Sequence, residues 1–123
     1  MPFFLIAAQD RADSPFNRLA DKQPVWAELT ELDAAMREAG VFVFSRGLES
    51  PDAAVTYRAG ADGSVVEEAG AQGDSTLGGM WIIDCTNAGE ARVWARRCAT
   101  AHRCDVELRA FQPNVSEYLE PVP

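Results

Sequence analysis

Three short segments of the 123-residue chain are apolar at every position, namely residues 3–8, 41–44 and 80–83. They are rich in Phe, Ile, Val and Trp, the residue types that favour β-strands. Successive side chains of a strand point to opposite faces of a sheet, so each segment would present apolar side chains on both faces. The sequence therefore predicts a central sheet that needs a cover on both sides.

Two amphipathic helices are predicted between these strands. The first lies between Pro24, which suits a first helical turn, and Gly40, which suits a helix end. The second spans about residues 88–99 and follows Asn87, which has Glu90 three positions later, the spacing of a capping box. The apolar stripes that define these helices are Val25, Leu29, Leu32, Met36 and Ala39, and Ala91, Trp94, Ala95 and Cys98. The acidic residues off the first stripe, expected on a solvated surface, are Glu28, Glu31, Asp33 and Glu38.

A hairpin and a last strand complete the predicted order of elements. Residues 54–58 and 64–67 flank the turn sequence Asp62-Gly63. Apolar and polar residues alternate over 105–110, which indicates a half-exposed strand. With the inserted hairpin removed, the order is βαββαβ. The predicted fold class is therefore α+β with a ferredoxin-like arrangement.

Two helices can cover only one face of such a sheet. The opposite face, equally apolar in the three segments above, would remain in contact with water. A second copy of the same sheet is the simplest cover, and a two-fold axis would relate the two copies. The sequence therefore predicts a homodimer.

Composition restricts the partners. The length suits one domain, over residues 1–111, followed by a proline-containing tail over 112–123. A net charge of −8 argues against nucleic acid and anionic membranes as partners. The N-terminal apolar segment has no preceding basic region and is too short for a signal peptide, so a cytoplasmic location is predicted. The three cysteines are expected to be reduced and mostly buried.

The order of several short motifs resembles the YCII-related family, and within it the DGPF-domain branch. The resemblance covers residues 3 to about 111 and implies a dimeric α+β barrel. The motifs that carry it are Gly40-Val41, Gly47-Leu48, Pro51, Asp62-Gly63, Leu77-Gly78-Gly79, residues 94–98 and residues 106–109. The Asp-Gly-Pro-Phe signature that gives the branch its name is replaced here by other residues over 67–72.

The family is also thought to use a histidine on the first helix together with an aspartate. The single histidine of this chain is His102, which lies far from that helix in the sequence. This pair is therefore not transferred to the chain. The spacing of His102 from Cys98 and Cys104 differs from that of standard zinc sites, and neither a metal nor a cofactor is predicted.

Candidate ligand-binding residues lie at the ends of the predicted strands. Arg46 follows an apolar strand and could bind a carboxylate through two hydrogen bonds. Tyr57 and Trp81 could line a cavity, although packing in the core is the favoured role for Trp81. Glu67, or its neighbour Glu68, could supply an acidic group, or lie exposed at the hairpin end. Two further candidates, in a glycine-containing loop that could bind an anion or simply connect two strands, are Asp74 and Ser75.

Three functions are compatible with this sequence. The first is a homodimer that binds a small organic molecule in a cleft between the helices and the sheet. The second is a lyase or isomerase acting on a small cyclic or hydroxylated acid, with Glu67, Asp74 or Tyr57 transferring the proton. The third is an accessory regulatory or interaction module.

Overall fold

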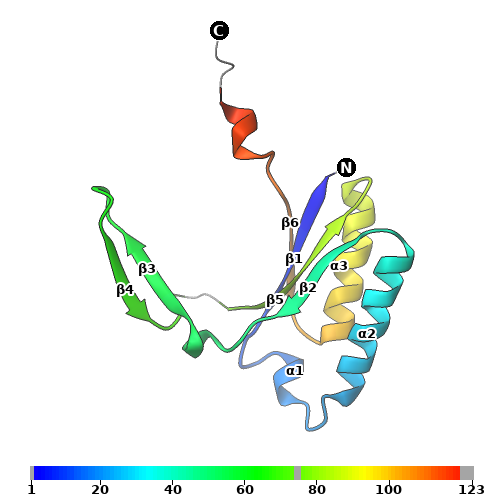
Figure 1. Ribbon diagram of the computed structural model, residues 1–123. Coiled ribbons are helices and arrows are strands. Elements are labelled where there is room, and N and C mark those ends of the chain that lie inside the picture. Colours follow the sequence, from blue (N-terminus) through cyan, green and yellow to red (C-terminus); the bar gives the residue numbers. More distant parts are fainter. Residues whose placement is uncertain (1, 74–75, 120–123) are drawn as a thin grey trace.

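The chain forms a four-stranded antiparallel sheet, two long helices on one face of it, and a separate β-hairpin (Figure 1). This computed structural model describes residues 2–73 and 76–119. Its elements are β1 (Phe3–Gln9), α1 (Pro15–Arg18), α2 (Gln23–Glu38), β2 (Phe42–Gly47), the 3₁₀ turn η1 (Pro51–Ala53), β3 (Val55–Ala59), β4 (Val65–Ala69), β5 (Leu77–Asp84), α3 (Ala88–His102), β6 (Val106–Ala110) and the 3₁₀ turn η2 (Val115–Tyr118). The predicted α+β class is confirmed.

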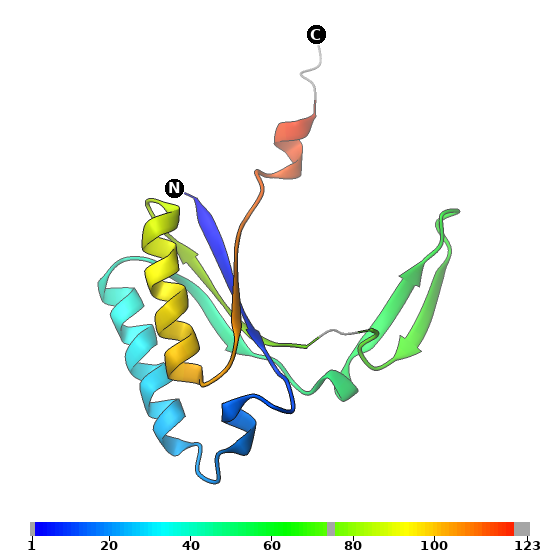
Figure 2. The same cartoon turned by 180° about the vertical axis from the view of Figure 1, so that it is seen from behind.

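The strand order in the main sheet is β2-β5-β1-β6. β5 pairs with β1 so that Leu5 lies opposite Ile82, and β1 pairs with β6 so that Leu5 lies opposite Arg109. Both α2 and α3 pack on the same face, as the views from front and back show (Figure 1 and Figure 2). The strands formed by the three apolar segments are therefore adjacent, with β5 between β2 and β1.

The hydrophobic core lies between this sheet and the two helices. Alternate residues of β1 and β5 point into it, including Ile6 and Ile83, both of which are fully buried. Met36 of α2 and Cys98 of α3 pack against them from the helical layer. The stripes predicted for the two helices are thus the stripes that face the sheet.

The helix boundaries follow the predicted signals closely. Gly40 ends α2 in a left-handed conformation with φ of +74°, which glycine adopts without strain. At the start of α3, the Asn87 Oδ1 atom accepts a hydrogen bond of 2.9 Å from the backbone N–H of Glu90. The Glu90 side chain in turn accepts a hydrogen bond of 3.1 Å from the backbone N–H of Thr86. A capping box would place this donor one residue later, at Asn87. This pair of bonds satisfies backbone donors that the helix itself leaves free.

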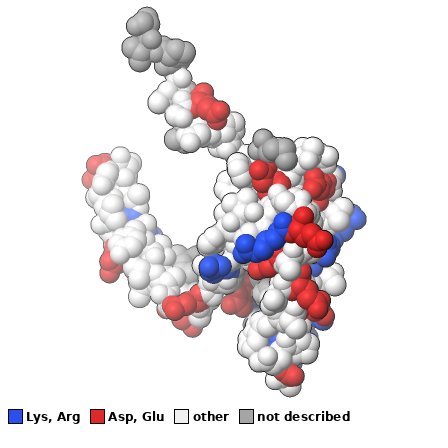
Figure 3. Space-filling model, turned by 45° about the vertical axis from the view of Figure 1, so that its right-hand side comes forward, with Lys and Arg blue, Asp and Glu red and all other residues white. Residues whose placement is uncertain are grey.

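The predicted hairpin is present as β3 and β4, which pair with each other in a second, two-stranded sheet. It projects from the side of the main sheet that the helices leave open, and Figure 3 shows it as a lobe that stands apart from the body. β5 begins at Leu77, three residues earlier than predicted, and the tail contains the short turn η2. None of the helices in residues 2–73 and 76–119 has the length and apolar character needed to cross a membrane.

The face of the main sheet opposite the helices carries apolar side chains. Phe3 and Leu5 of β1 share this face with Ile82 and Met80 of β5, as their cross-strand pairing requires. Phe44 extends it across β2, opposite Ile82. Within the described residues no helix covers this face, which we call the open face. The two-sided apolar pattern of the sequence is therefore present in the fold.

Candidate functional site

A cleft of about 330 Å³ lies between α2 and the ends of β2 and β5. Its volume falls within the roughly 300–1,000 Å³ that is usual for small-molecule sites. The side chains that give it chemical character are Asp33, Arg46 and His102, and its apolar walls include Trp26, Leu29 and Trp81. Sequence-distant elements thus place three titratable groups around one cavity.

Two glycines of β5 form part of the cleft, and one of them explains how closely β2 and β5 approach. A Cβ atom on Gly79 would lie 3.1 Å from the backbone oxygen of Arg46 and 3.2 Å from the Cα atom of Gly47. A Cβ atom on Gly78 would lie 2.6 Å from the Cβ atom of Asp10. Side chains at these two positions would crowd the backbone around the cleft. The Leu77-Gly78-Gly79 motif therefore has a structural role at the site.

Asp33 lies on α2, and one of its carboxylate oxygens, Oδ1, is buried without a hydrogen-bond partner among residues 2–73 and 76–119. Burial raises the pKa of Asp33 above its ordinary value of 3.8, and the nearby Trp81, Arg37 and Arg46 act in the opposite direction. Asp33 was expected on a solvated helix surface, and it lies instead half-buried at the edge of the cleft. A carboxyl group in such surroundings is a candidate proton donor or a hydrogen-bond partner for a ligand.

His102, at the end of α3, also lines the cleft and lies close to Trp81. Its ring lies 4.8 Å from the ring of Phe16 and 6.1 Å from that of Trp81, the latter in an edge-to-face arrangement. Its Nδ1 atom is buried and has no hydrogen-bond partner in the part of the chain that the structure describes. Burial lowers the pKa of His102 below the ordinary 6.5 and so favours the neutral ring, which can accept a proton.

The lowered pKa of His102 has a measurable consequence for stability. As pH falls below 6.5, the unfolded chain binds a proton at this residue more readily than the folded chain, so the folded state loses stability. We expect the free energy of unfolding to decrease from pH 6.5 downward, and the variant His102→Gln to lack this decrease. Because the chain has one histidine, its ring C–H signals in a proton NMR titration report the folded pKa without assignment. A midpoint at or above 6.5 would contradict the prediction.

Arg46 borders the cleft from β2. Its Nη1 atom donates a hydrogen bond of 2.7 Å to its neighbour's carbonyl, that of Ser45, and its guanidinium lies 5.4 Å from the ring of Phe44. Among residues 2–73 and 76–119 no acidic side chain forms a salt bridge with it. Cross-strand pairing with Met80 puts Arg46 on the open-face side of β2, where this strand borders the cleft. Several of its donors are therefore available for an anionic group at that border.

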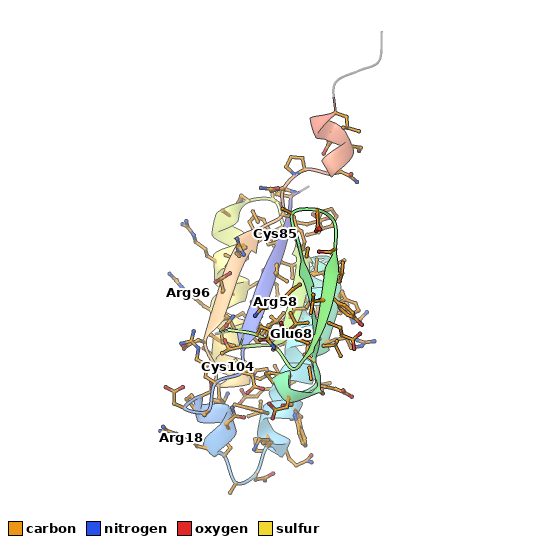
Figure 4. The ribbon with its side chains drawn as sticks, turned by 90° about the vertical axis from the view of Figure 1, so that its left-hand side faces the viewer. Arg18, Arg58, Glu68, Cys85, Arg96 and Cys104 are labelled. Atoms are coloured by element: carbon orange, nitrogen blue, oxygen red, sulfur yellow. The ribbon has the colours of Figure 1, made fainter. Side chains whose placement is uncertain are left out.

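The structure divides the residues predicted from the sequence into three groups. Arg46 and Trp81 both line the cleft, and Trp81 is only 4% exposed, so it also belongs to the core. Tyr57 and Glu67 lie opposite each other on the hairpin and are not among the residues lining the cleft. Asp74 and Ser75 lie outside the described residues. Glu68, the alternative to Glu67, forms a 2.8 Å salt bridge with Arg58 on the neighbouring strand (Figure 4).

One feature of the sequence could have indicated that Asp33 belongs to the candidate site. It lies four residues after Leu29 and seven after Trp26, so it continues the edge of an apolar stripe and shares a helix face with both. An acidic residue at such a position is a stronger candidate than one on the opposite face. No comparable signal marked His102, because its approach to the cleft depends on the packing of α3 against β1 and β6 of the sheet.

The cysteines have the properties of core residues. Cys85, Cys98 and Cys104 are buried and unpaired, as predicted. Burial raises the pKa of the Cys85 thiol to about 11 and that of Cys98 to about 12, so both remain protonated and unreactive. In the part of the chain that the structure describes, no group of three or more His, Cys, Asp and Glu side chains has an arrangement suited to a metal ion.

Comparison with known proteins gives no further indication, since no family model and no curated protein matches the chain.

Proposed function

We propose that the protein is a homodimer of the YCII-related type, DGPF branch, which binds a small organic acid in the cleft between α2 and the sheet. The strand order β2-β5-β1-β6, with both long helices on one face, supports a ferredoxin-like arrangement. The apolar open face supports the dimer, because contact with a second copy of the chain would remove it from water. The order of the short motifs in the sequence supports the proposed membership of this family.

The cleft carries the proposal of ligand binding. It combines apolar walls with a small number of polar groups, which is the usual composition of a small-molecule site. The decisive observation is that two residues lining the cleft, Asp33 and His102, each have a buried atom, Oδ1 and Nδ1, with no hydrogen-bond partner within the described residues. A buried polar atom without a partner costs about 1–3 kcal/mol, so a ligand toward which Asp33 and His102 turn these atoms would recover part of that cost.

These groups define the chemistry of the ligand. A carboxylate of the ligand would bind Arg46 through charge-assisted hydrogen bonds. A hydroxyl group elsewhere on the ligand would donate to Asp33 or His102. A ring or short apolar chain would contact Trp26 and Leu29. A hydroxylated or aromatic carboxylic acid satisfies all three requirements.

A thermal-shift screen of hydroxylated and aromatic carboxylic acids tests this proposal. We expect a binding acid to raise the melting temperature, since a ligand specific to the folded state stabilises it. Arg46→Ala should weaken that acid about 10- to 100-fold, the loss expected when a hydrogen-bonded charge is removed. The matched control is Arg92→Ala, which removes an exposed arginine of α3 outside the cleft. Absence of any stabilising acid, or equal weakening by both substitutions, would contradict the proposal.

A second candidate function is a lyase or isomerase acting on the same class of acid. The observation that favours it is the position of Asp33 and His102 around one cleft. Burial raises the pKa of Asp33 and lowers that of His102, so the two pKa values move toward each other, as suits a proton donor and acceptor at one site. This pair takes the role that the sequence analysis assigned to Glu67, Asp74 or Tyr57. In such an enzyme Arg46 would hold the carboxylate while a proton moves at the neighbouring carbon.

A further inference from the structure

The two faces of the β3–β4 hairpin differ in character. Cross-strand pairing places Val55, Tyr57 and Val65 on one face, together with Glu67. All three of these apolar side chains are more than half exposed, Tyr57 at 63% and Val65 at 61%. We call this the apolar face of the hairpin. When apolar and polar side chains alternate along a strand pair, the apolar face is normally buried, so the exposure of this face is unusual.

The opposite face already has its polar partners within the hairpin. Arg58 and Glu68 form their 2.8 Å salt bridge there, and the Thr56 hydroxyl donates a 2.8 Å hydrogen bond to the carbonyl of Gly70. Beyond their mutual pairing, β3 and β4 make few contacts with the other elements. A two-stranded hairpin is only marginally stable in water unless one face packs against something. The apolar face is the one available for that packing.

We propose that the apolar face of the hairpin docks on the open face of the sheet in a second copy of this chain. The proposal rests on the homodimer proposed above and adds the contact that holds it together. A two-fold axis would make the contact reciprocal, so that each copy contributes one hairpin and receives one.

The exposed apolar area is of the size that such a contact needs. Phe3, Phe44 and Phe111 at the open face and Tyr57 on the hairpin are each between 42% and 63% exposed. At about 200 Å² for each aromatic side chain, these four alone expose on the order of 400 Å². A stable interface needs about 800 Å² from each partner, so they supply about half of it. The exposed valines of the hairpin and a wide hollow beside Phe3 and Ile82 add to this area.

Charge is also complementary between the two surfaces. Among the paired positions on the apolar face of the hairpin, the charged residue is Glu67. The open face has an arginine on each edge strand, Arg46 on β2 and Arg109 on β6. Arg109 lies 3.5 Å from Glu107 on its own strand, whereas Arg46 has no salt bridge within the described residues. A docked hairpin could therefore place Glu67 beside an arginine, which favours correct pairing of two copies.

Val65 and Val66 are adjacent in the sequence but lie on opposite faces of the hairpin, so substitutions at these two positions test the proposal. Sedimentation equilibrium would compare the wild type with Tyr57→Ser/Val65→Ser and with the control Val66→Ser, whose side chain is 57% exposed on the other face. We expect the double variant to raise the dimer dissociation constant about 100-fold or more, because each change acts twice in a two-fold dimer, and the control to leave it unchanged. Equal dissociation constants for all three proteins would overturn the hairpin contact and leave the dimer itself intact. A monomeric wild type at micromolar concentration would overturn both.

Hydrogen exchange on the wild type provides a second measurement that needs no variant. If the hairpin docks on a second copy, protection of the β3 and β4 amides rises with protein concentration. Protection that is the same at all concentrations would instead mean that the hairpin packs on its own chain or stays free, and would overturn the inference.

Discussion

Replacing Ile83 with alanine is expected to lower the free energy of unfolding by about 2–5 kcal/mol. Ile83 is completely buried between the sheet and the helices, where the smaller side chain would leave a cavity. The total stability of a domain is about 5–15 kcal/mol, so this single change could remove a large part of it. Urea denaturation followed by circular dichroism measures the loss, which should not depend on protein concentration.

The neighbouring Ile82 is a matched control, because it has the same side chain on the opposite face of β5. It is only partly buried in the single chain and lies on the open face. If that face meets a second copy, Ile82→Ala should destabilise the protein mainly at concentrations where the dimer is populated. Equal losses at both positions, unaffected by dilution, would argue against an interface on the open face.

Replacing Asp33 with asparagine is expected to slow proton transfer and to stabilise the folded state. If Asp33 is the proton donor or acceptor, removing its titratable group should slow proton transfer about 10²- to 10⁴-fold. The assay uses an acid found by the thermal-shift screen, incubated with the protein in D₂O, and follows the loss of its carbon-bound proton signal by NMR. A wild type that catalyses no exchange with any binding acid would remove the enzyme hypothesis and leave the binding function in place.

The same substitution should stabilise the folded state at neutral pH. Because burial raises the pKa of Asp33, its ionised form is less favourable in the folded chain than in the unfolded chain. Asparagine avoids this cost above the folded pKa, and the gain should disappear below the ordinary pKa of 3.8. Glu38→Gln, on the exposed end of the same helix, should change neither proton exchange nor stability by a comparable amount. A destabilised Asp33→Asn variant would show that the carboxylate has a structural role.

The elements of this fold could be predicted because each depends on local pattern. Continuous apolar runs gave the three central strands, spacings of three and four gave the helices, and Asp62-Gly63 gave the hairpin turn. The candidate site depends instead on contacts between residues distant in sequence. His102 meets Trp81 only because α3 packs on the sheet, and Asp33 is half-buried where α2 borders the cleft beside residues of β2 and β5. Charge and spacing alone could not separate Asp33 from the solvated acidic residues of the same helix.

The placement of the tryptophans gives the cleft an optical reporter of its own. Trp26 and Trp81 both line it, one half exposed and the other almost fully buried, whereas Trp94 lies in the core beside Arg97, at 4.6 Å. Indole emission depends on exposure to water, so occupation of the cleft would alter the signal of the first two and leave that of Trp94 as an internal reference. Ligand titrations can therefore follow the unlabelled protein by its intrinsic fluorescence. Single replacements of Trp26 or Trp94 by phenylalanine would separate the signal of the cleft tryptophans from that of Trp94.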